Sequence, residues 1–301
     1  MRIRLGMVLT AAAAVMLTTQ ARSQTSGASA ETSDARRACL ADGTPPDQRL
    51  ASCSAVITSD QGGEPQGLAS VFIGRGNAYL AKGDYGHALA DFDQATRIDP
   101  GNVNPFNGRG LVLVRQRQFD RGIAEFDQAI KLSPKNVLVL TNRGDAYREK
   151  GRLDRALQDY DSAIEINPKW TNAYFGRALT FQEKASYDFD AYLNEGSFED
   201  RAIADYSKVL ELAPKSAGAC SNRGQLYLRE RKYDLAIADF TQAIQLNSSN
   251  PTFIKNRASA YIMTRQYDLA IADYRKTLTL KVDAGTRKEI VAALNELGAA
   301  P

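Results

Sequence analysis

Six arginines recur along the sequence, and each is followed by a carboxylate at an equivalent place downstream. The arginines are Arg75, Arg109, Arg143, Arg177, Arg223 and Arg257. The carboxylates are Asp91, Glu125, Asp159, Asp205, Asp239 and Asp273. A guanidinium group binds a carboxylate or an anionic ligand through parallel hydrogen bonds. Our interpretation is that each arginine pairs with its own carboxylate and fixes the register of two helices. The alternative is an arginine ladder for anionic ligands.

Residues typical of catalysis are missing from the sequence. His87 is the only histidine, and it lies at a position that we expect to be exposed. The sequence has no Cys-x-x-Cys pair, no Gly-x-Ser-x-Gly motif and no phosphate-binding loop. We therefore predict a protein that is not an enzyme, with no catalytic residue, no metal site and no cofactor.

The arginines belong to a unit that repeats every 34 residues. Six units cover 69–102, 103–136, 137–170, 171–216, 217–250 and 251–284, and the fourth contains an insert at 185–196. With the insert of the fourth unit left out of the numbering, small residues recur at the eighth and twentieth positions and aromatic residues at the twenty-fourth. The eleventh position is aromatic in every unit except the second, which has Leu113. Residues at these spacings share one face of a helix. We therefore predict two helices per unit, and the units must stack because one unit alone cannot bury its apolar face.

This pattern resembles the tetratricopeptide repeat family. In the third unit the matching residues are Gly144, Tyr147, Ala156, Tyr160 and Pro168. The resemblance covers residues 69–284, and the chain looks like exported bacterial members of the family. It implies an all-α fold, a right-handed superhelical solenoid of antiparallel helix pairs with a concave groove.

Residues 1–23 are predicted to be a signal peptide. A positively charged start precedes an apolar run and then small residues that suit cleavage before Gln24. The alternative, a membrane anchor, is disfavoured because the run is shorter than the roughly 20 residues that a spanning helix needs. Removing the three arginines of this segment from the 38 basic residues leaves 35, which equals the 35 acidic residues. We therefore expect an exported, periplasmic or secreted protein that neither binds nucleic acid nor inserts its mature chain into a membrane.

Residues 24–68 precede the regular repeats. Within them, 37–57 are predicted to form a short helical pair, a degenerate half-sized repeat that a glycine-rich linker follows. Cys39 and Cys53 lie close together in a chain that we expect to be exported, which favours a disulfide. The alternative is two unpaired buried thiols. Cys220 is left over and is expected to be a small buried hydrophobic residue.

Residues 285–301, after the last repeat, are predicted to form one more amphipathic helix. Its apolar stripe consists of Ile290, Ala293, Leu294 and Leu297. We expect it to cover the open end of the stack as a capping helix.

The family resemblance implies that the groove is lined by the first helix of each repeat. The candidate partner-binding residues there are Asn142, Arg148, Phe175, Leu179, Asn222, Gln225, Arg229, Lys255 and Asn256. The three asparagines occupy the sixth position of their repeats, where in several family members an asparagine holds the backbone of an extended peptide. An amide suits this role because it both donates and accepts hydrogen bonds. The alternative is that the apolar part of the groove is covered by 24–68 or by a second copy of the chain.

The insert carries three aromatic residues among acidic ones. Tyr187, Phe189 and Tyr192 are candidates for contact with a partner, because exposed aromatic residues often mark interaction sites. The alternative is that the first helix of the fourth repeat continues into the insert and packs on its neighbour.

These features together predict a non-enzymatic scaffold that binds a protein or peptide in its groove. We expect it to serve as an adaptor or assembly factor of the cell envelope. The alternative is a self-associating structural protein, a homo-oligomer whose apolar groove is buried between copies.

Overall fold

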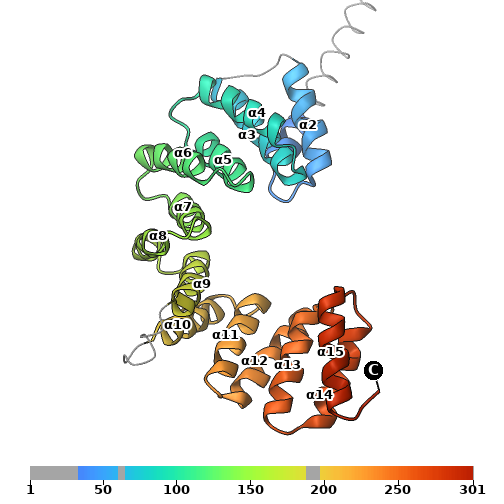
Figure 1. Ribbon diagram of the computed structural model, residues 1–301. Helices are drawn as coiled ribbons and strands as arrows, with labels where there is room; N and C mark the ends of the chain where they lie inside the picture. The colour runs from blue at the N-terminus through green and yellow to red at the C-terminus, as the bar shows by residue number, and fades with distance from the viewer. Residues whose placement is uncertain (1–32, 60–64, 188–196, 301) are drawn as a thin grey trace, which may run out of the picture. The chain divides into compact units, whose positions relative to one another are not determined.

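The computed structural model describes residues 33–59, 65–187 and 197–300, and every regular element in these ranges is a helix (Figure 1). The chain divides into two compact units, Met1–Pro134 and Lys135–Pro301. The predicted signal peptide at 1–23 lies outside the described residues.

Both units are stacks of helix pairs joined by short turns, as the repeat predicts (Figure 1). In the first unit a helical stretch at 33–40 is followed by α2 (Pro46–Thr58), α3 (Pro65–Lys82), α4 (Tyr85–Ile98), α5 (Val103–Arg115) and α6 (Phe119–Leu132). The second unit contains α7 (Val137–Glu149), α8 (Leu153–Ile166), α9 (Thr171–Tyr187), α10 (Phe198–Leu212), α11 (Ala217–Arg229), α12 (Tyr233–Leu246), α13 (Pro251–Met263), α14 (Tyr267–Leu278) and α15 (Ala284–Glu296). In each repeat the two helices pack on one another, and each second helix also packs on the next repeat within its unit.

Short polar side chains start most of the first helices of the repeats. The side chains of Asn102, Asn136, Ser216 and Asn250 each accept a hydrogen bond from a backbone N–H of the first turn. Such a cap satisfies a donor that has no partner within the helix. Local sequence therefore fixes where these helices begin.

Glycines let the aromatic rings of several second helices reach the helices around them. A Cβ atom added to Gly144 on α7 would lie 2.8 Å from the ring of Tyr160, and one added to Gly176 on α9 would lie 2.6 Å from it. Carbon atoms cannot approach this closely without a shift of the ring. Tyr160 therefore packs between its own repeat and the next, which explains why small residues recur beside a large one.

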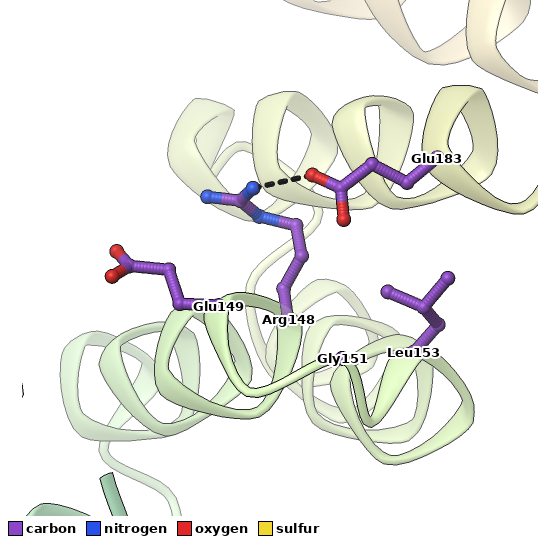
Figure 2. Close-up of a pocket in the computed structure, with 5 residues that line it drawn as sticks. All are labelled: Arg148, Glu149, Gly151, Leu153 and Glu183. Atoms are coloured by element: carbon purple, nitrogen blue, oxygen red, sulfur yellow. Dashed lines mark hydrogen bonds and ion pairs between the residues drawn. The ribbon is translucent and has the colours of Figure 1, made fainter. Parts of the chain in front are cut away.

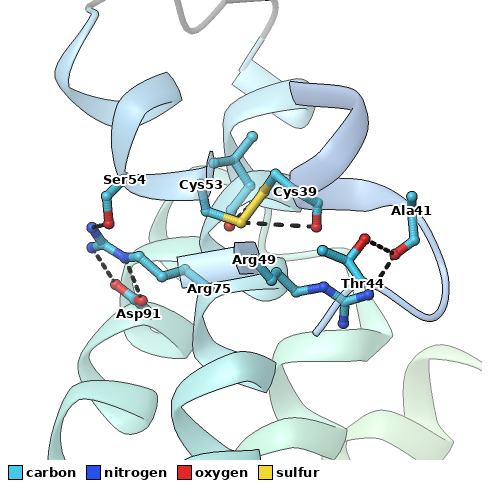
Figure 3. Close-up of a disulfide and its surroundings, with 9 residues drawn as sticks. Cys39, Ala41, Thr44, Arg49, Cys53, Ser54, Arg75 and Asp91 are labelled. Atoms are coloured by element: carbon cyan, nitrogen blue, oxygen red, sulfur yellow. Dashed lines mark hydrogen bonds and ion pairs between the residues drawn. A yellow bond between two sulfur atoms is a disulfide. The ribbon is translucent and has the colours of Figure 1, made fainter. Parts of the chain in front are cut away.

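A disulfide joins Cys39 to Cys53, as predicted, with an S–S distance of 2.07 Å. It links the helical stretch at 33–40 to α2 (Figure 3). Both cysteines are buried with Val56 and Val71. The free cysteine, Cys220, is buried against the second unit's apolar residues.

The disulfide occupies the place that an aromatic ring takes in the regular repeats. A Cβ atom added to Gly74 on α3 would lie 3.3 and 3.4 Å from the two sulfur atoms, as one on Gly176 would face Tyr160. The next residue, Ser54, accepts a hydrogen bond from Arg75 at 3.4 Å (Figure 3). Helix α2 therefore packs on the first repeat as the second helix of a preceding repeat would.

Helix α15 covers the last repeat. Ile290 and Leu294 are buried against Ala258 and Tyr274, while Ala293 and Leu297 pack at the edge of the same cluster. Two nitrogens of Arg275 donate to the carbonyl oxygen of Ala300 at 3.0 and 2.8 Å, which holds the end of the chain on α14.

The first helix of the fourth repeat continues into the start of the insert, as far as Tyr187, the last residue of α9. The insert residues 188–196 lie outside the described part of the chain. The same holds for the side chain of Tyr187. Contact of a partner with the three aromatic candidates, Tyr187, Phe189 and Tyr192, therefore stays a prediction.

We predict that the disulfide stabilises the first unit. Closing a loop of about 15 residues restricts the unfolded chain and is worth about 3 kcal/mol. Replacing both Cys39 and Cys53 by serine should lower the free energy of unfolding by about 2–4 kcal/mol, measured by urea denaturation followed by circular dichroism.

A reducing agent should destabilise the unaltered protein by a similar amount and leave the double-serine variant unchanged. Cys220→Ala serves as the control, because it removes the free thiol and keeps the response to reductant. An equal unfolding midpoint for oxidised and fully reduced protein would contradict the prediction.

Candidate functional site

Each of the six arginines pairs with the carboxylate of its own repeat. Arg143 on α7 donates from Nε to Asp159 Oδ2 at 2.9 Å and from Nη2 to Oδ1 at 2.6 Å. The other pairs, at 2.7–3.0 Å, are Arg75–Asp91, Arg109–Glu125, Arg177–Asp205, Arg223–Asp239 and Arg257–Asp273. The predicted pairing is confirmed. An arginine ladder for anionic ligands is wrong, because the carboxylates already bind the guanidinium groups.

Within each unit, arginines of this set also bridge to the preceding helix pair, which the sequence analysis missed. Arg177 Nη1 donates to Asp161 of the third repeat at 2.6 Å, and Arg223 Nη1 donates to Ser207 of the fourth at 3.0 Å. The equivalent contacts are Arg75–Ser54, Arg109–Asp93 and Arg257–Thr241. The sequence carried a signal for these bridges, because a residue with a side-chain oxygen stands two positions after every paired carboxylate except Asp273. Each such arginine ties together three helices.

Tyrosine hydroxyls hold polar side chains on the first helices of the second unit. Tyr160 Oη donates to Asp145 Oδ1 at 2.6 Å. Tyr206 Oη donates to Gln182 Oε1 and accepts from Asn222 Nδ2 at 3.2 Å. Burial raises the pKa of both tyrosines, so their hydroxyls keep their protons and act as donors.

The tyrosine network continues at an ion pair between α7 and α9. Arg148 Nη1 donates to Glu183 Oε1 at 2.6 Å. Burial raises the pKa of Asp145, one turn before Arg148, although Tyr160 and Arg148 both act to lower it. A cleft of about 490 Å³ opens beside this pair, lined by Arg148, Glu149, Gly151, Leu153 and Glu183 (Figure 2). The site is a mixed hydrogen-bonding and charged surface that spans three repeats.

The predicted groove residues lie in several different environments. Arg229 pairs with Glu199 at 3.2 Å, and Lys255 pairs with Glu289 of α15 at 3.1 Å. Phe175 packs edge-on against Tyr206, with ring centres 5.6 Å apart. The remaining candidates, Asn142, Leu179, Gln225 and Asn256, are half-buried on α7, α9, α11 and α13. The structure brings Arg148 and Asn222 into one network, and the binding role of all these residues stays a prediction.

The network also contains residues that the sequence analysis did not predict as binding residues. Gln182, Glu183 and Tyr206 contribute as much to it as the candidates do. A signal was present, since the aromatic position of the second helix is Tyr in the third, fourth and sixth repeats and Phe in the others. The hydroxyl of the last of these, Tyr274, lies 3.4 Å from Ser259 Oγ.

Within residues 33–59, 65–187 and 197–300, no group of three or more His, Cys, Asp and Glu side chains is placed to hold a metal ion. His87 is exposed, bonded through Nδ1 to Asp84 at 2.7 Å and stacked on Tyr79. In the same ranges no helix is both long and apolar enough to cross a membrane.

Parts of the sequence match models of known protein families. Models described as tetratricopeptide repeat match residues 107–169 and 217–250, and one described as TPR repeat matches 76–117. These matches show that the chain contains tetratricopeptide repeats. Its all-α superhelical fold is that of the family, whose members typically act as scaffolds for other proteins.

Several solved structures share this fold. Pseudomonas aeruginosa pilF is 18% identical, with a TM-score of 0.64 over 75% of this chain and 97% of that one. A tetratricopeptide repeat protein from Parabacteroides merdae is 15% identical, with a TM-score of 0.59 over 87% and 98%. TTC0263 from Thermus thermophilus is 20% identical, with a TM-score of 0.52 over 64% and 100%. At these identities the likeness shows the fold alone. No curated protein matches the sequence.

We predict that the arginine bridges stabilise the stack. Arg223→Lys keeps the charge but loses the paired hydrogen bonds to Asp239 and the bridge to Ser207. The free energy of unfolding should fall by about 1–3 kcal/mol. Urea denaturation can be followed by the fluorescence of Trp170, the only tryptophan, whose Nε1 donates to Thr141 in the second unit at 2.9 Å.

Arg152→Lys is the matched control, because Arg152 is exposed and its side chain makes no hydrogen bond or ion pair within the described residues. If the Arg223 and Arg152 variants unfold at the same urea concentration, the bridge contributes nothing to stability.

Proposed function

We propose that this protein is a non-enzymatic scaffold that binds an extended segment of a partner protein along the first helices of its second unit. The observation that carries the proposal is the row of polar side chains held by tyrosine hydroxyls. Asp145, Gln182 and Asn222 come from three successive repeats, and each is hydrogen-bonded to Tyr160 or Tyr206. Side chains fixed before binding lose little conformational entropy when a ligand arrives.

Three asparagines support the choice of an extended peptide as the ligand. Asn142, Asn222 and Asn256 lie at equivalent positions of α7, α11 and α13, half-buried on the same side of the stack. An amide can donate to a peptide carbonyl and accept from a peptide N–H at the same time. Repetition of this group at the spacing of the repeats suits a ligand that itself repeats, as an extended backbone does.

The chemistry of the network supports binding rather than catalysis. The hydroxyls of Tyr160 and Tyr206 hold their protons because burial raises the pKa of both. Arg148 is bonded to Glu183. These groups can orient a ligand through hydrogen bonds, and none of them is a nucleophile activated by a neighbouring base.

The proposal places the protein in the cell envelope, as an exported adaptor or assembly factor. The N-terminal pattern before Gln24 supports export, and so does the Cys39–Cys53 disulfide, since disulfides persist in oxidising compartments. Mass spectrometry of the protein purified from its own cells should find a mature chain that begins at Gln24. A chain that retains residues 1–23 would contradict this placement.

The partner can be identified by cross-linking in intact cells, and the groove can then be tested with it. Replacing both Asn222 and Asn256 by alanine should weaken binding of that partner at least tenfold, because two hydrogen bonds to its backbone are lost. Isothermal titration calorimetry measures the affinity, and a thermal melt confirms that the variant is folded.

Asn295→Ala on α15 is the control, since this exposed side chain makes no hydrogen bond within the described residues and does not belong to the first helix of a repeat. Equal affinities for the double variant and the unaltered protein would rule out the groove. Light scattering on the same samples distinguishes a bound partner from a second copy of the chain, which is the self-associating alternative.

A further inference from the structure

The hydroxyl of Tyr206 contacts two amide side chains that come from successive repeats. It donates a hydrogen bond to Gln182 Oε1 on α9 and accepts one from Asn222 Nδ2 on α11 at 3.2 Å. Tyr206 is fully buried, and its ring is held by the core of the fourth repeat and by an edge-on contact with Phe175. The hydroxyl therefore has a fixed place beside both amides.

The single proton of this hydroxyl determines how the two amides are turned. Burial raises the pKa of Tyr206, so the phenol keeps its proton. A phenol donates only one hydrogen bond, and this one goes to Gln182. The contact with Asn222 must then be one in which the hydroxyl accepts. Asn222 consequently turns its NH2 group toward the tyrosine, and Gln182 turns its carbonyl oxygen toward it.

The opposite end of each amide is left for a ligand. Asn222 Oδ1 and Gln182 Nε2 make no hydrogen bond within the described residues. Neither is among the buried side-chain atoms that lack a partner, so both are accessible to solvent. They lie on the first helices of the fifth and fourth repeats. Asn222 therefore presents an acceptor there, and Gln182 presents a donor.

The next asparagine of the row has no such anchor. Asn256 follows Phe240 at the same spacing of 16 residues at which Asn222 follows Tyr206, but a phenylalanine has no hydroxyl. The side chain of Asn256 makes no hydrogen bond within the described residues. Its amide can present either its oxygen or its NH2 group to a ligand, whereas the amide of Asn222 presents its oxygen.

We infer that Tyr206 is a positioning residue, which holds Asn222 as the acceptor for one backbone N–H of the bound segment. This inference rests on the proposed function and defines its ligand further. The partner residue opposite Asn222 must carry an N–H, so any residue except proline fits there. Gln182, turned the other way by the same hydroxyl, donates to a carbonyl oxygen of that segment.

A ligand oxygen does not fit opposite Asn222 Oδ1. The two oxygens would face one another with no proton between them, which is unfavourable. Rotation of the amide would relieve this contact but would place Oδ1 against the Tyr206 hydroxyl, whose only proton is bonded to Gln182. The hydroxyl thus makes one orientation of Asn222 more stable than the other.

A peptide recovered from a random library displayed on phage, with the full chain as the target, serves as the probe. Synthetic copies each carry one amide-to-ester replacement, which deletes one N–H and adds no bulk. Fluorescence anisotropy should find one replacement that weakens binding about tenfold, because it places an ester oxygen against Asn222 Oδ1. In Asn222→Ala the same replacement should weaken binding no further, because the contact is already lost.

Tyr206→Phe tests the positioning role, because it keeps the ring and removes the hydroxyl. The unmodified peptide should bind about threefold more weakly, since the amide of Asn222 must now be ordered on binding. The effect of the ester should fall from about tenfold to about twofold, because the released amide can turn its NH2 group to the ester oxygen. A merely structural role of the hydroxyl would weaken both peptides equally and keep the tenfold difference.

Tyr274→Phe is the matched control. It removes a hydroxyl at the equivalent place of the sixth repeat, where the contact is with Ser259 and not with an asparagine. The tenfold effect of the ester should persist in this variant. An ester effect of the same size in Tyr206→Phe, or recovered peptides that have proline at the sensitive place, would overturn the inference.

The two proposals fail in different ways in this experiment. Peptides that bind equally well to the Asn222 and Asn256 double variant show that the groove itself is not the site, and the inference about Tyr206 then falls with it. Peptides that depend on these asparagines, but on no ester replacement coupled to Asn222, leave the groove in place and overturn only the role of Tyr206.

Discussion

The stack depends on the arginine that ties three helices together. Arg177 binds Asp205 with two nitrogens inside its own repeat and Asp161 of the preceding repeat with the third. Burial raises the pKa of Asp205, and the hydrogen bonds from Arg177 counteract that rise. Removing either partner would leave a buried charge unpaired, which is a larger penalty than the net gain from the pair. The arrangement therefore fixes the register of the helices more than it adds stability.

The aromatic residue of the second helix is the other constraint on stacking, and it connects packing to binding. Tyr160 fits only because Gly144 and Gly176 leave room for its ring. Its hydroxyl donates a hydrogen bond to Asp145 on the first helix, which a phenylalanine at this position could not make. Packing and the organisation of the groove thus share one residue, and the substitution of Tyr for Phe changes the groove without changing the core.

Before the first repeat, a disulfide occupies the place that an aromatic ring has in the regular repeats. Cys53 stands where the later repeats have Phe or Tyr, and its bond to Cys39 brings sulfur atoms against Gly74. A half-sized repeat buries little apolar surface, and the covalent link compensates by restricting the unfolded chain. At the other end the last repeat is covered by α15, whose Ile290 and Leu294 are buried against Ala258 and Tyr274.

The sequence alone predicted the repeat, its helices and the arginine–carboxylate pairs, and it favoured the pairing of Cys39 with Cys53. The first three follow from spacing along the chain, because residues at helical intervals share a face and equivalent positions of a repeat must have equivalent contacts. The disulfide was expected for a different reason, because the two cysteines lie close together in a chain predicted to be exported. The sequence did not determine which polar residues form the site. The bond between Arg148 and Glu183, and that between Tyr206 and Asn222, join different repeats whose offset the period alone does not give. Only the tertiary structure showed these two bonds. Which side chains of neighbouring repeats meet depends on the distance between the packed helices, and the aromatic ring of the second helix determines that distance.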